Sequence, residues 1–465
     1  MSDKSGQTEE NEAKSQSGWM TRLLEKAPQP VFVFYATAVA FCTYFCMYAF
    51  RKPFSAAKFD GEEFGWFSSD VTLKSAVVIS QILGYALSKY IGLKVCSEIT
   101  PSKRAWMMVG LILFAETSLL FYGFVPGEWK VIPIFFNGLP LGMVWGVVVW
   151  FLEGRRTSEI LMAGLSCSFI MSSGIVKDFG IKLMNGTIAS QWESIPIIGS
   201  VIGGQIGEVS ESWMPFIVGL HFLPLFFLSV WMLSRIPKPN QKDVEERAER
   251  TQMNGSRRWD FIKQFAFGLS MLCIVYLLIT VSRDFRDNFM VDILEDLGVE
   301  DNEDNDSFIS TSETIVAFIV MGVMAGLNIL RNNRRGLIAA FIVMGVGCFM
   351  LAFSSFAISE KSITPFSYMV ATGLGSYLIY VPFNSMLFDR IIAVTKFSGT
   401  AVFAIYVADS IGYSGVVVLL FIKDRIFSEI SHFQFFNSIT LHISYISLIF
   451  LVASLFYFLN KKPAK

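Results

Sequence analysis

Charged side chains are scarce in this 465-residue chain. They make up 17% of the residues, against roughly 25% in an average soluble domain. Neither sign of charge is in excess, because 38 Lys and Arg residues are balanced by 39 Asp and Glu residues. The scarcity of charge excludes a soluble multidomain enzyme. The balance of charge gives no indication of a nucleic-acid partner, and none is expected.

Residue types that build reactive centres are also few. The six cysteines include no CxxC pair and lie almost entirely in apolar runs, so they indicate packing rather than disulfides or a zinc site. Only three histidines are present, and the chain has no HExxH motif, no paired-Asp motif and no P-loop. We therefore expect no cofactor and no bound metal. A polytopic membrane enzyme is the less favoured functional class.

Long apolar runs, by contrast, recur along the whole chain. A bilayer core requires about 20 apolar residues per helix, and breaks rich in charge or turn residues separate twelve runs of this length. The runs cover residues 31–51, 73–93, 105–125, 131–152, 159–184, 213–234, 261–282, 309–330, 336–358, 364–388, 397–421 and 438–459. The sequence therefore predicts an all-α membrane protein with twelve transmembrane helices.

The charged interval 235–260 divides these runs into six and six, as expected of a linker between two bundles. The N-terminal residues are rich in Ser, Glu, Gln and Lys and lack the apolar segment of a signal peptide, so they predict a disordered tail. The predicted units are a tail at 1–30, a six-helix bundle at 31–234, a linker at 235–260, a six-helix bundle at 261–459 and a tail at 460–465.

Lys and Arg residues concentrate in alternate segments between the runs, on the side that carries both termini. Positive residues are retained on the cytoplasmic side of short loops. We therefore expect a monomer in the bilayer of a cell (inner) membrane rather than an organelle membrane, with both termini cytoplasmic. On the opposite side, the acidic loop 295–306 lacks the Gly and terminal Glu of an EF-hand, so a solvated loop is favoured over a calcium site.

Ionisable side chains within the apolar runs are the main functional candidates. Each costs insertion free energy, so such residues usually face a cavity or a partner. They are Arg51, Lys89, Glu116, Lys177, Asp178, Lys182, Arg283, Arg286 and Asp409.

The first run carries a polar stripe. Tyr44, Tyr48 and Arg51 lie at i, i+4 and i+7 and share one helical face. A guanidinium group offers a planar fork for phosphate or carboxylate, and phenol hydroxyls can donate to the remaining oxygens. The alternative is that Arg51 marks the membrane surface and the tyrosines belong to the interfacial aromatic belt. Pro53 predicts that this helix kinks or ends early.

Lys89 lies about nine residues before the inner membrane boundary at Glu98, too deep for its ammonium group to reach the surface easily. It is expected to contact either a ligand or an embedded acid such as Glu116 or Asp409. An isolated carboxylate at the depth of Asp409 is unfavourable, so Asp409 should be partnered by Lys89, Arg51 or a tyrosine hydroxyl.

The fifth run holds three charges close together. Asp178 and Lys182 lie at i and i+4 and could neutralise one another on the helix surface. This pairing would leave Lys177 as the unpaired charge of the run. These three residues are candidates for coupling or for a structural role.

Short segments in both halves carry a family resemblance when they are taken in order. They are YFCMYAFRKPFSAAKF (44–59), ISQILGYALSKYIGLKVCSEITPSKR (79–104), VGLILFAETSLLFYGFVPGEW (109–129), GMVWG (142–146), VSRDFRDNFMVDIL (281–294), LIYVP (378–382), and SGTA with GYSG (398–415). They are similar to helices of the organophosphate:phosphate antiporters, the glycerol-3-phosphate and hexose-phosphate transporters. The resemblance implies the major facilitator fold, in which two pseudo-symmetric six-helix bundles face one another.

The resemblance also implies site residues. In that family one arginine from helix one and one from helix seven hold the phosphate, and these roles fall here on Arg51 and Arg283. Arg286 is spaced to share a face with Arg283, so either could hold the anion. The positions that match residues facing the family's central cavity are Tyr44, Tyr48, Lys89 and Tyr413.

The function implied by the resemblance is secondary transport of an organic phosphate, a sugar phosphate or similar anion, by exchange with inorganic phosphate. Alternating access of the two bundles would move the substrate. The open alternative is a transporter-like receptor that senses an anionic ligand without moving it.

Overall fold

A computed structural model gives the fold. It describes residues 18–59, 64–65, 72–98, 100–153, 155, 157–187, 209–239, 255–299, 307–397 and 401–461. The elements of the first half are α2 (Trp19–Lys26), α3 (Gln29–Tyr48), η1 (Pro53–Ala56), α4 (Leu73–Glu98), η2 (Pro101–Lys103), α5 (Arg104–Phe124), η3 (Gly127–Lys130), α6 (Val131–Leu152), α7 (Ser158–Met184) and α10 (Met214–Leu233). Those of the second half are α12 (Gly255–Asn288), α13 (Met290–Asp296), α14 (Phe308–Asn328), α15 (Asn333–Ser359), α16 (Pro365–Ser385), α17 (Leu387–Thr395), α18 (Ala401–Ile426) and α19 (His432–Asn460).

The long helices coincide with the predicted apolar runs. Ten of the described helices are long and apolar enough to cross a membrane, or eleven if the bent pair α16 and α17 forms one span. α4 has 26 residues but is not one of these ten, and it carries Lys74, Gln81 and Lys89. Large hydrophobic side chains such as Phe34 and Phe349 remain exposed, as expected of surfaces that face lipid. The chain is an integral multi-pass membrane protein.

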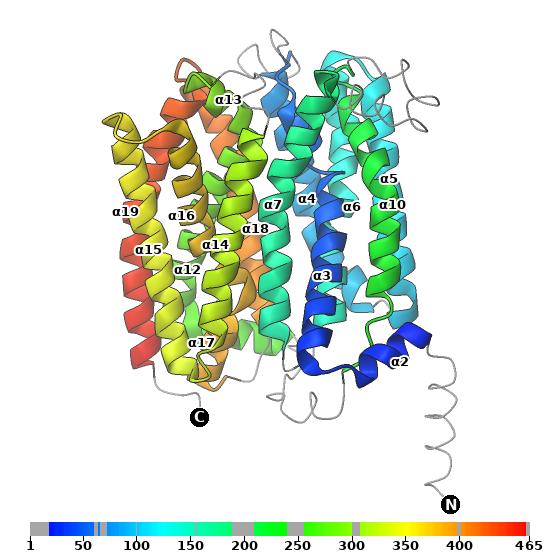
Figure 1. Ribbon diagram of the computed structural model, residues 1–465. Coiled ribbons are helices and arrows are strands. Elements are labelled where there is room, and N and C mark those ends of the chain that lie inside the picture. Colours follow the sequence, from blue (N-terminus) through cyan, green and yellow to red (C-terminus); the bar gives the residue numbers. More distant parts are fainter. Residues whose placement is uncertain are drawn as a thin grey trace, which may run out of the picture.

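The helices form two bundles side by side (Figure 1). α3 to α10 make one bundle and α12 to α19 the other, and the closest packing between the bundles joins α7 to α14 and α4 to α18. α2 and the last turn of α19 lie at the same end of the molecule, at the bottom of Figure 1, whereas α13 lies at the opposite end. We call these the α2 end and the α13 end.

Glycine allows α4 and α6 to pack backbone against backbone. A Cβ atom on Gly84 would lie 2.1 Å from the carbonyl oxygen of Phe135, and one on Gly138 would lie 2.2 Å from that of Gln81. Small residues at helix crossings permit this approach in membranes, where packing and not water drives association. The close crossing sets the position of the polar residues on α4 that face the other bundle.

Two helix ends differ from the predicted runs. α3 ends at Tyr48 rather than at residue 51, and the turn that follows leads into the 3₁₀ segment at Pro53. This ending agrees with the effect expected of that proline. α12 begins at Gly255 rather than at residue 261 and continues to Asn288, so the arginines of the seventh run lie inside a continuous helix.

The run 364–388 is not one helix. α16 ends at Ser385, and α17 continues after Met386 at an angle of 50°. Pro382 lies inside the last turn of α16 and cannot donate a backbone hydrogen bond, which weakens the helix before the bend.

The predicted N-terminal tail also contains a helix. α2 buries Leu24, and Thr21 Oγ1 donates to the carbonyl of Arg235 at 3.1 Å, so its amphipathic face is fixed to the first bundle. Residues 1–17, most of the linker (240–254) and the end of the acidic loop (300–306) lie outside the described residues. Within the described part of the chain, no group of three or more His, Cys, Asp or Glu residues could hold a metal ion.

Candidate functional site

A polar cavity lies between the two bundles. Its volume is about 20 Å³, room for roughly one water molecule, so the bundles are close together around it. The first bundle contributes Tyr44, Tyr48, Arg51, Tyr85, Lys89, Trp145 and Phe169, and the second contributes Arg283, Tyr380, Asn384, Asp409 and Tyr413. We call it the central cavity.

The end of α3 places Arg51 in the central cavity. Because α3 stops at Tyr48, the carbonyl groups of Phe50 and Arg51 lack regular helical partners. Gln81 Nε2 donates to the Arg51 carbonyl at 2.9 Å, and Asn137 Nδ2 donates to the Phe50 carbonyl at 3.0 Å. Gln81 and Asn137 also bond one another at 2.8 Å. Side chains of α4 and α6 therefore fix the turn from which Arg51 projects.

The guanidinium group of Arg51 stacks on aromatic rings. Its central carbon lies 4.0 Å from the ring centre of Tyr85 and 5.7 Å from that of Tyr48, within the range of cation–π attraction. In the described ranges, Arg51 Nε has no hydrogen-bond partner and no ion pair with Arg51 is found. The faces of the two rings thus stabilise the positive charge of Arg51, and this charge remains available to an anion.

Arg283 is the counterpart from the second bundle. Its central carbon lies 4.4 Å from the ring centre of Tyr380, and its Nη2 lies 3.4 Å from Oδ1 of the neighbouring Asp284. Arg283 Nε finds no acceptor among the residues described. Arg51 and Arg283 line the same cavity from opposite bundles, which is the placement that we predicted for them.

Lys89 and Asp409 form an ion pair across the cavity, with Lys89 Nζ 3.3 Å from Asp409 Oδ2. Tyr276 donates its hydroxyl proton to Oδ1 of Asp409, and Asn384 Nδ2 donates to the Tyr276 hydroxyl at 3.3 Å. Asp409 therefore has the expected partner, Lys89. Glu116, the other acid that was considered as a partner of Lys89, does not form an ion pair with it.

Glu116 lies elsewhere, in α5 against α10. It is buried, and its carboxylate packs on Gly219. Both of its carboxylate oxygens lack a hydrogen-bond partner within the described part of the chain. An unpartnered carboxylate is unfavourable in such a place, and Glu116 does not belong to the central cavity.

Arg286 does not line the central cavity. Its Nη2 lies 2.7 Å from Oε1 of Glu313 and donates to the carbonyl of Met369 at 2.7 Å. The prediction that either Arg283 or Arg286 faces the cavity is thereby resolved in favour of Arg283. Three residues along a helix turn a side chain through about 60°, enough to direct the two arginines to different neighbours.

A second polar cluster closes the space between the bundles on the α13 side. Lys52 Nζ lies 2.6 Å from Oδ2 of Asp287, and Lys177 Nζ lies 2.7 Å from Oδ1 of the same carboxylate. Ser173 donates to this carboxylate too, and Lys52 donates to Asn288 at 2.8 Å. We call this set the Asp287 cluster. Every one of these bonds joins one bundle to the other.

The Asp287 cluster corrects the interpretation of the fifth run. Lys177 is not left unpaired, because Asp287 of α12 binds it. Asp178 accepts a hydrogen bond from the backbone N–H of Ser310 at 2.8 Å, and Lys182 donates to Ser307 at 3.1 Å. Lys177, Asp178 and Lys182 thus all contact residues of the second bundle. A search for charged pairs within one helix cannot find such contacts.

Several parts of the site escape a search for ionisable residues inside the apolar runs. They are the supports Gln81 and Asn137, the aromatic platforms Tyr85 and Tyr380, and Asp287, which follows the end of the predicted run 261–282. Gln81 and Asn137 are amides inside apolar runs, and this was a usable signal, because a buried amide must find partners. The platforms carried no signal that separates them from aromatic residues of the core.

The charges around the central cavity do not cancel. Lys89 and Asp409 neutralise one another, and Arg283 has the carboxylate of Asp284 at 3.4 Å. Arg51 has no ion pair among the described residues, so the guanidinium groups of Arg51 and Arg283 face the cavity with one positive charge that is not balanced. Guanidinium groups bind carboxylate and phosphate through parallel hydrogen bonds. The arrangement is suited to an anion that contacts both bundles at once.

Comparison with known proteins agrees with this architecture. No curated protein matches the sequence. The solved structure of a bacterial homolog of the human lysosomal transporter Spinster, in an inward-facing and unoccupied conformation, matches with a TM-score of 0.56 and 11% identity, over 93% of this chain and 97% of that one. The likeness shows the fold, and the chain has the major facilitator fold. A family model covers residues 53–461, so the chain belongs to a family of unknown function, DUF5690.

Proposed function

We propose that this protein is a secondary transporter of an organic anion, in which an organic phosphate exchanges with inorganic phosphate. One observation carries the proposal: two buried guanidinium groups, from Arg51 and Arg283, face one small cavity from opposite bundles. Arg283 has Asp284 beside it at 3.4 Å, whereas Arg51 has no ion pair among the described residues, and a buried charge without a partner is unfavourable until an anion binds it. A phosphate dianion would meet both guanidinium groups and accept several hydrogen bonds.

Alternating access follows from this placement. An anion bound to Arg51 and Arg283 would draw the bundles together and favour the occluded state that an empty carrier reaches slowly. The Asp287 cluster would hold the α13 side closed while the α2 side opens. Because the chain offers no P-loop, the driving force would be a substrate gradient.

The remaining side chains of the cavity would select the organic part of the substrate. Tyr44, Tyr48 and Tyr413 offer ring faces and hydroxyl groups, which suit sugar or polyol hydroxyls. The Lys89–Asp409 pair could open to offer its ammonium group to a third phosphate oxygen. We propose these residues as substrate contacts beside the two arginines.

The orientation belongs to the same proposal. Basic residues cluster at the α2 end, where Arg22, Lys26, Arg331 and Arg335 lie in or beside the ends of described helices. By the positive-inside rule this end would be cytoplasmic, so the transporter would carry both termini inside a cell (inner) membrane.

The test is counterflow of labelled phosphate in proteoliposomes loaded with phosphate. Wild-type protein should exchange phosphate, and Arg51→Lys should lower exchange by about tenfold or more, since an ammonium group cannot form two parallel hydrogen bonds. Arg335→Lys, at an exposed position, is the matched control and should be almost silent.

Two results would contradict the proposal. Near-normal exchange by Arg51→Lys would show that Arg51 does not hold the anion through two parallel hydrogen bonds. Saturable binding of phosphate without any flux would identify a receptor and not a carrier.

A further inference from the structure

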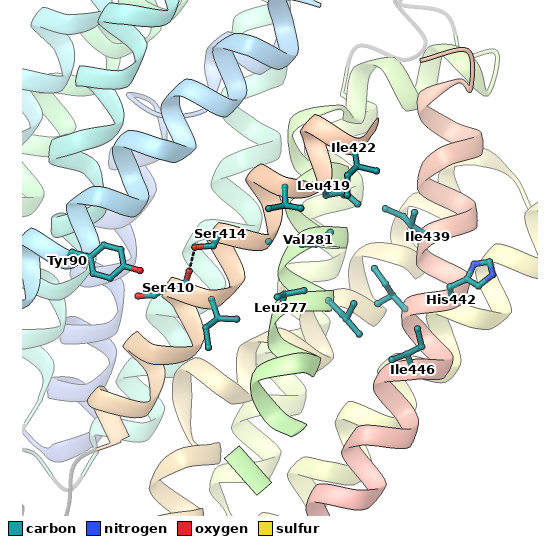
Figure 2. Close-up of a pocket in the computed structure, with 15 residues that line it drawn as sticks. Tyr90, Leu277, Val281, Ser410, Ser414, Leu419, Ile422, Ile439, His442 and Ile446 are labelled. Atoms are coloured by element: carbon teal, nitrogen blue, oxygen red, sulfur yellow. Dashed lines mark hydrogen bonds between the residues drawn. The ribbon is translucent and has the colours of Figure 1, made fainter. Parts of the chain in front are cut away.

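A second cavity lies on the membrane-facing side of the C-terminal bundle. α18 and α19 form its walls and α12 its floor (Figure 2). Its volume is about 680 Å³, within the roughly 300–1,000 Å³ of small-molecule sites. The cavity exists because α18 and α19 each pack along α12 but hardly against one another. We call it the lateral groove.

The equivalent place in the N-terminal bundle is filled by protein. α3, α7 and α10 are the first, fifth and sixth long helices of their bundle, as α12, α18 and α19 are of theirs. There the ring of Phe222 lies 6.1 Å from that of Phe45 and 5.7 Å from that of Phe179, which also contacts His221 at 5.3 Å. Aromatic side chains thus fill, in the N-terminal bundle, the space that corresponds to the lateral groove of the C-terminal bundle.

The dimensions of the lateral groove match a lipid chain. Its lining on α18 extends from Ser410 to Ile422, about 18 Å of helix. A hydrocarbon core is roughly 30 Å thick, so the groove covers about one leaflet. Val418 on this wall is 57% exposed. Since the groove lies within the membrane-spanning part of the helices, lipid hydrocarbon is the medium that meets it.

The lining is aliphatic apart from a few uncharged polar groups. Its polar residues are Tyr90, Ser410, Ser414 and His442, and no described lining residue is an Asp, Glu, Lys or Arg. An ionised headgroup would find no counter-charge here and would lose its hydration. The groove therefore suits an uncharged molecule.

The serines and the histidine offer acceptors rather than donors. Ser410 Oγ donates its proton to the carbonyl of Tyr406 at 2.9 Å, and Ser414 Oγ donates to the carbonyl of Ser410 at 2.8 Å. His442, at the edge of the groove, has Nδ1 2.7 Å from the carbonyl of Ser438. A carbonyl only accepts, so Nδ1 carries a proton, and in the neutral tautomer with this proton Nε2 presents a lone pair. A ligand that bonds to these three residues must bring a hydrogen-bond donor, and the hydroxyl group of Tyr90, which also lines the groove, can donate to the same ligand group.

We propose that the lateral groove binds an uncharged membrane lipid that carries a hydroxyl group. Its apolar chain lies along α12 between α18 and α19, and its hydroxyl group donates to Ser410 or Ser414. Tyr90 belongs to α4 of the other bundle, so the bound lipid contacts both halves of the transporter. The site is independent of the substrate that the central cavity takes.

Photolabelling tests the proposal. Purified protein in phosphatidylcholine vesicles is irradiated with hexadecanol that carries a diazirine in its chain, or with the matching hexadecane probe, and the labelled peptides are mapped. The alcohol should label the groove-lining segments of α18 and α19 about fivefold more than the alkane, as one net hydrogen bond predicts. Unlabelled hexadecanol should compete, whereas hexadecyl methyl ether, which has no donor for Ser410, Ser414 and His442, should compete several-fold more weakly.

Variants locate the site. Val418→Trp should reduce labelling by the alcohol several-fold, because the indole fills the groove. Ile342→Trp, at a comparably exposed position of α15, should not. The triple change Ser410→Ala, Ser414→Ala and His442→Phe should reduce labelling by the alcohol to the level of the alkane. Equal labelling by both probes, or labelling of α15 as strong as that of α18, would overturn the proposal. Because the readout is a covalent label and not transport, failure of this proposal and failure of the proposed phosphate exchange can be distinguished.

Discussion

At the residue scale, burial decides what each ionisable side chain can do. Arg51 is almost fully buried, yet aromatic faces and not a carboxylate surround its guanidinium group. Arg286, three positions after Arg283, has its charge matched by Glu313. The same residue type therefore serves as a ligand-binding candidate in one place and as a structural ion pair in another, and the difference lies in the partner.

The pair of Lys89 and Asp409 provides a test at this scale. Lys89→Met alone should lower the thermal stability of the detergent-solubilised protein strongly, since breaking a buried ion pair costs about 3–5 kcal/mol. Asp409→Asn alone should also destabilise, because it leaves a buried ammonium group. The double variant removes both charges and should be more stable than either single variant.

An exposed pair supplies the control for this cycle. Lys58 and Glu295 form an ion pair at 3.0 Å, but their side chains are 33% and 62% exposed. Lys58→Met and Glu295→Gln should change stability little and additively, because exposed pairs contribute about 0–1 kcal/mol. If the changes at Lys89 and Asp409 were additive as well, the ion pair would not be formed in the protein.

At the element scale, the helices that form the site are positioned by backbone contacts. α4 carries Tyr85 and Lys89, and its position against α6 depends on Gly84 and Gly138. α3 depends on the same crossing, because Asn137 of α6 binds the carbonyl at its end. A change at this crossing should therefore affect both the fold and the site.

Gly138→Ala should greatly reduce the yield of folded protein. The new Cβ would lie 2.2 Å from the carbonyl oxygen of Gln81, so α4 and α6 would have to separate and the close packing would be lost. Gly110→Ala is the matched control, because nothing lies within 4 Å of its new Cβ. It should be neutral or slightly stabilising, since alanine favours helix by about 1 kcal/mol over glycine.

Size-exclusion chromatography of both variants from the same membranes measures this difference. Normal recovery of Gly138→Ala with an unshifted melting temperature would show that the crossing is looser than the structure indicates. A loss of Gly110→Ala equal to that of Gly138→Ala would show that the effect is not specific to the crossing.

At the scale of the whole molecule, the two bundles are joined more strongly on one side of the central cavity. The Asp287 cluster, together with an ion pair of 2.6 Å between Lys74 and Asp292, joins them on the α13 side. These bonds must break when that side opens. Their number indicates that the state seen here is closed toward the α13 end.

Asp287→Asn should favour opening of the α13 side. The change removes the charge that holds Lys52 and Lys177 and leaves two lysines that repel one another. The measurement uses Phe169→Cys, a position that lines the central cavity, in a background without the native cysteines. A membrane-impermeant thiol reagent, applied on the α13 side, should react about tenfold faster after Asp287→Asn.

The exposed ion pair again supplies the control. Glu295→Gln breaks a bond between the bundles at a solvent-exposed place and should leave the reaction rate almost unchanged. An unchanged rate in Asp287→Asn would mean that the cluster does not control closure of this side.

The sequence alone determined the helical architecture and most of its bounds. A membrane core of fixed thickness requires apolar runs of a set length with internally bonded backbones, so runs such as 131–152 and 159–184 mark α6 and α7 almost to the residue. Ionisable residues inside such runs are costly, which is why Arg51, Lys89 and Asp409 were recognisable as special.

Only the tertiary structure decided which of these side chains meet. Lys177 binds Asp287 of the other bundle, and Arg283 enters the central cavity whereas Arg286 turns to Glu313. Periodicity along one helix determines which residues share a face, but it does not determine which helix covers that face. Periodicity does not predict the lateral groove either, because the groove arises where α18 and α19 pack on α12 and hardly on one another.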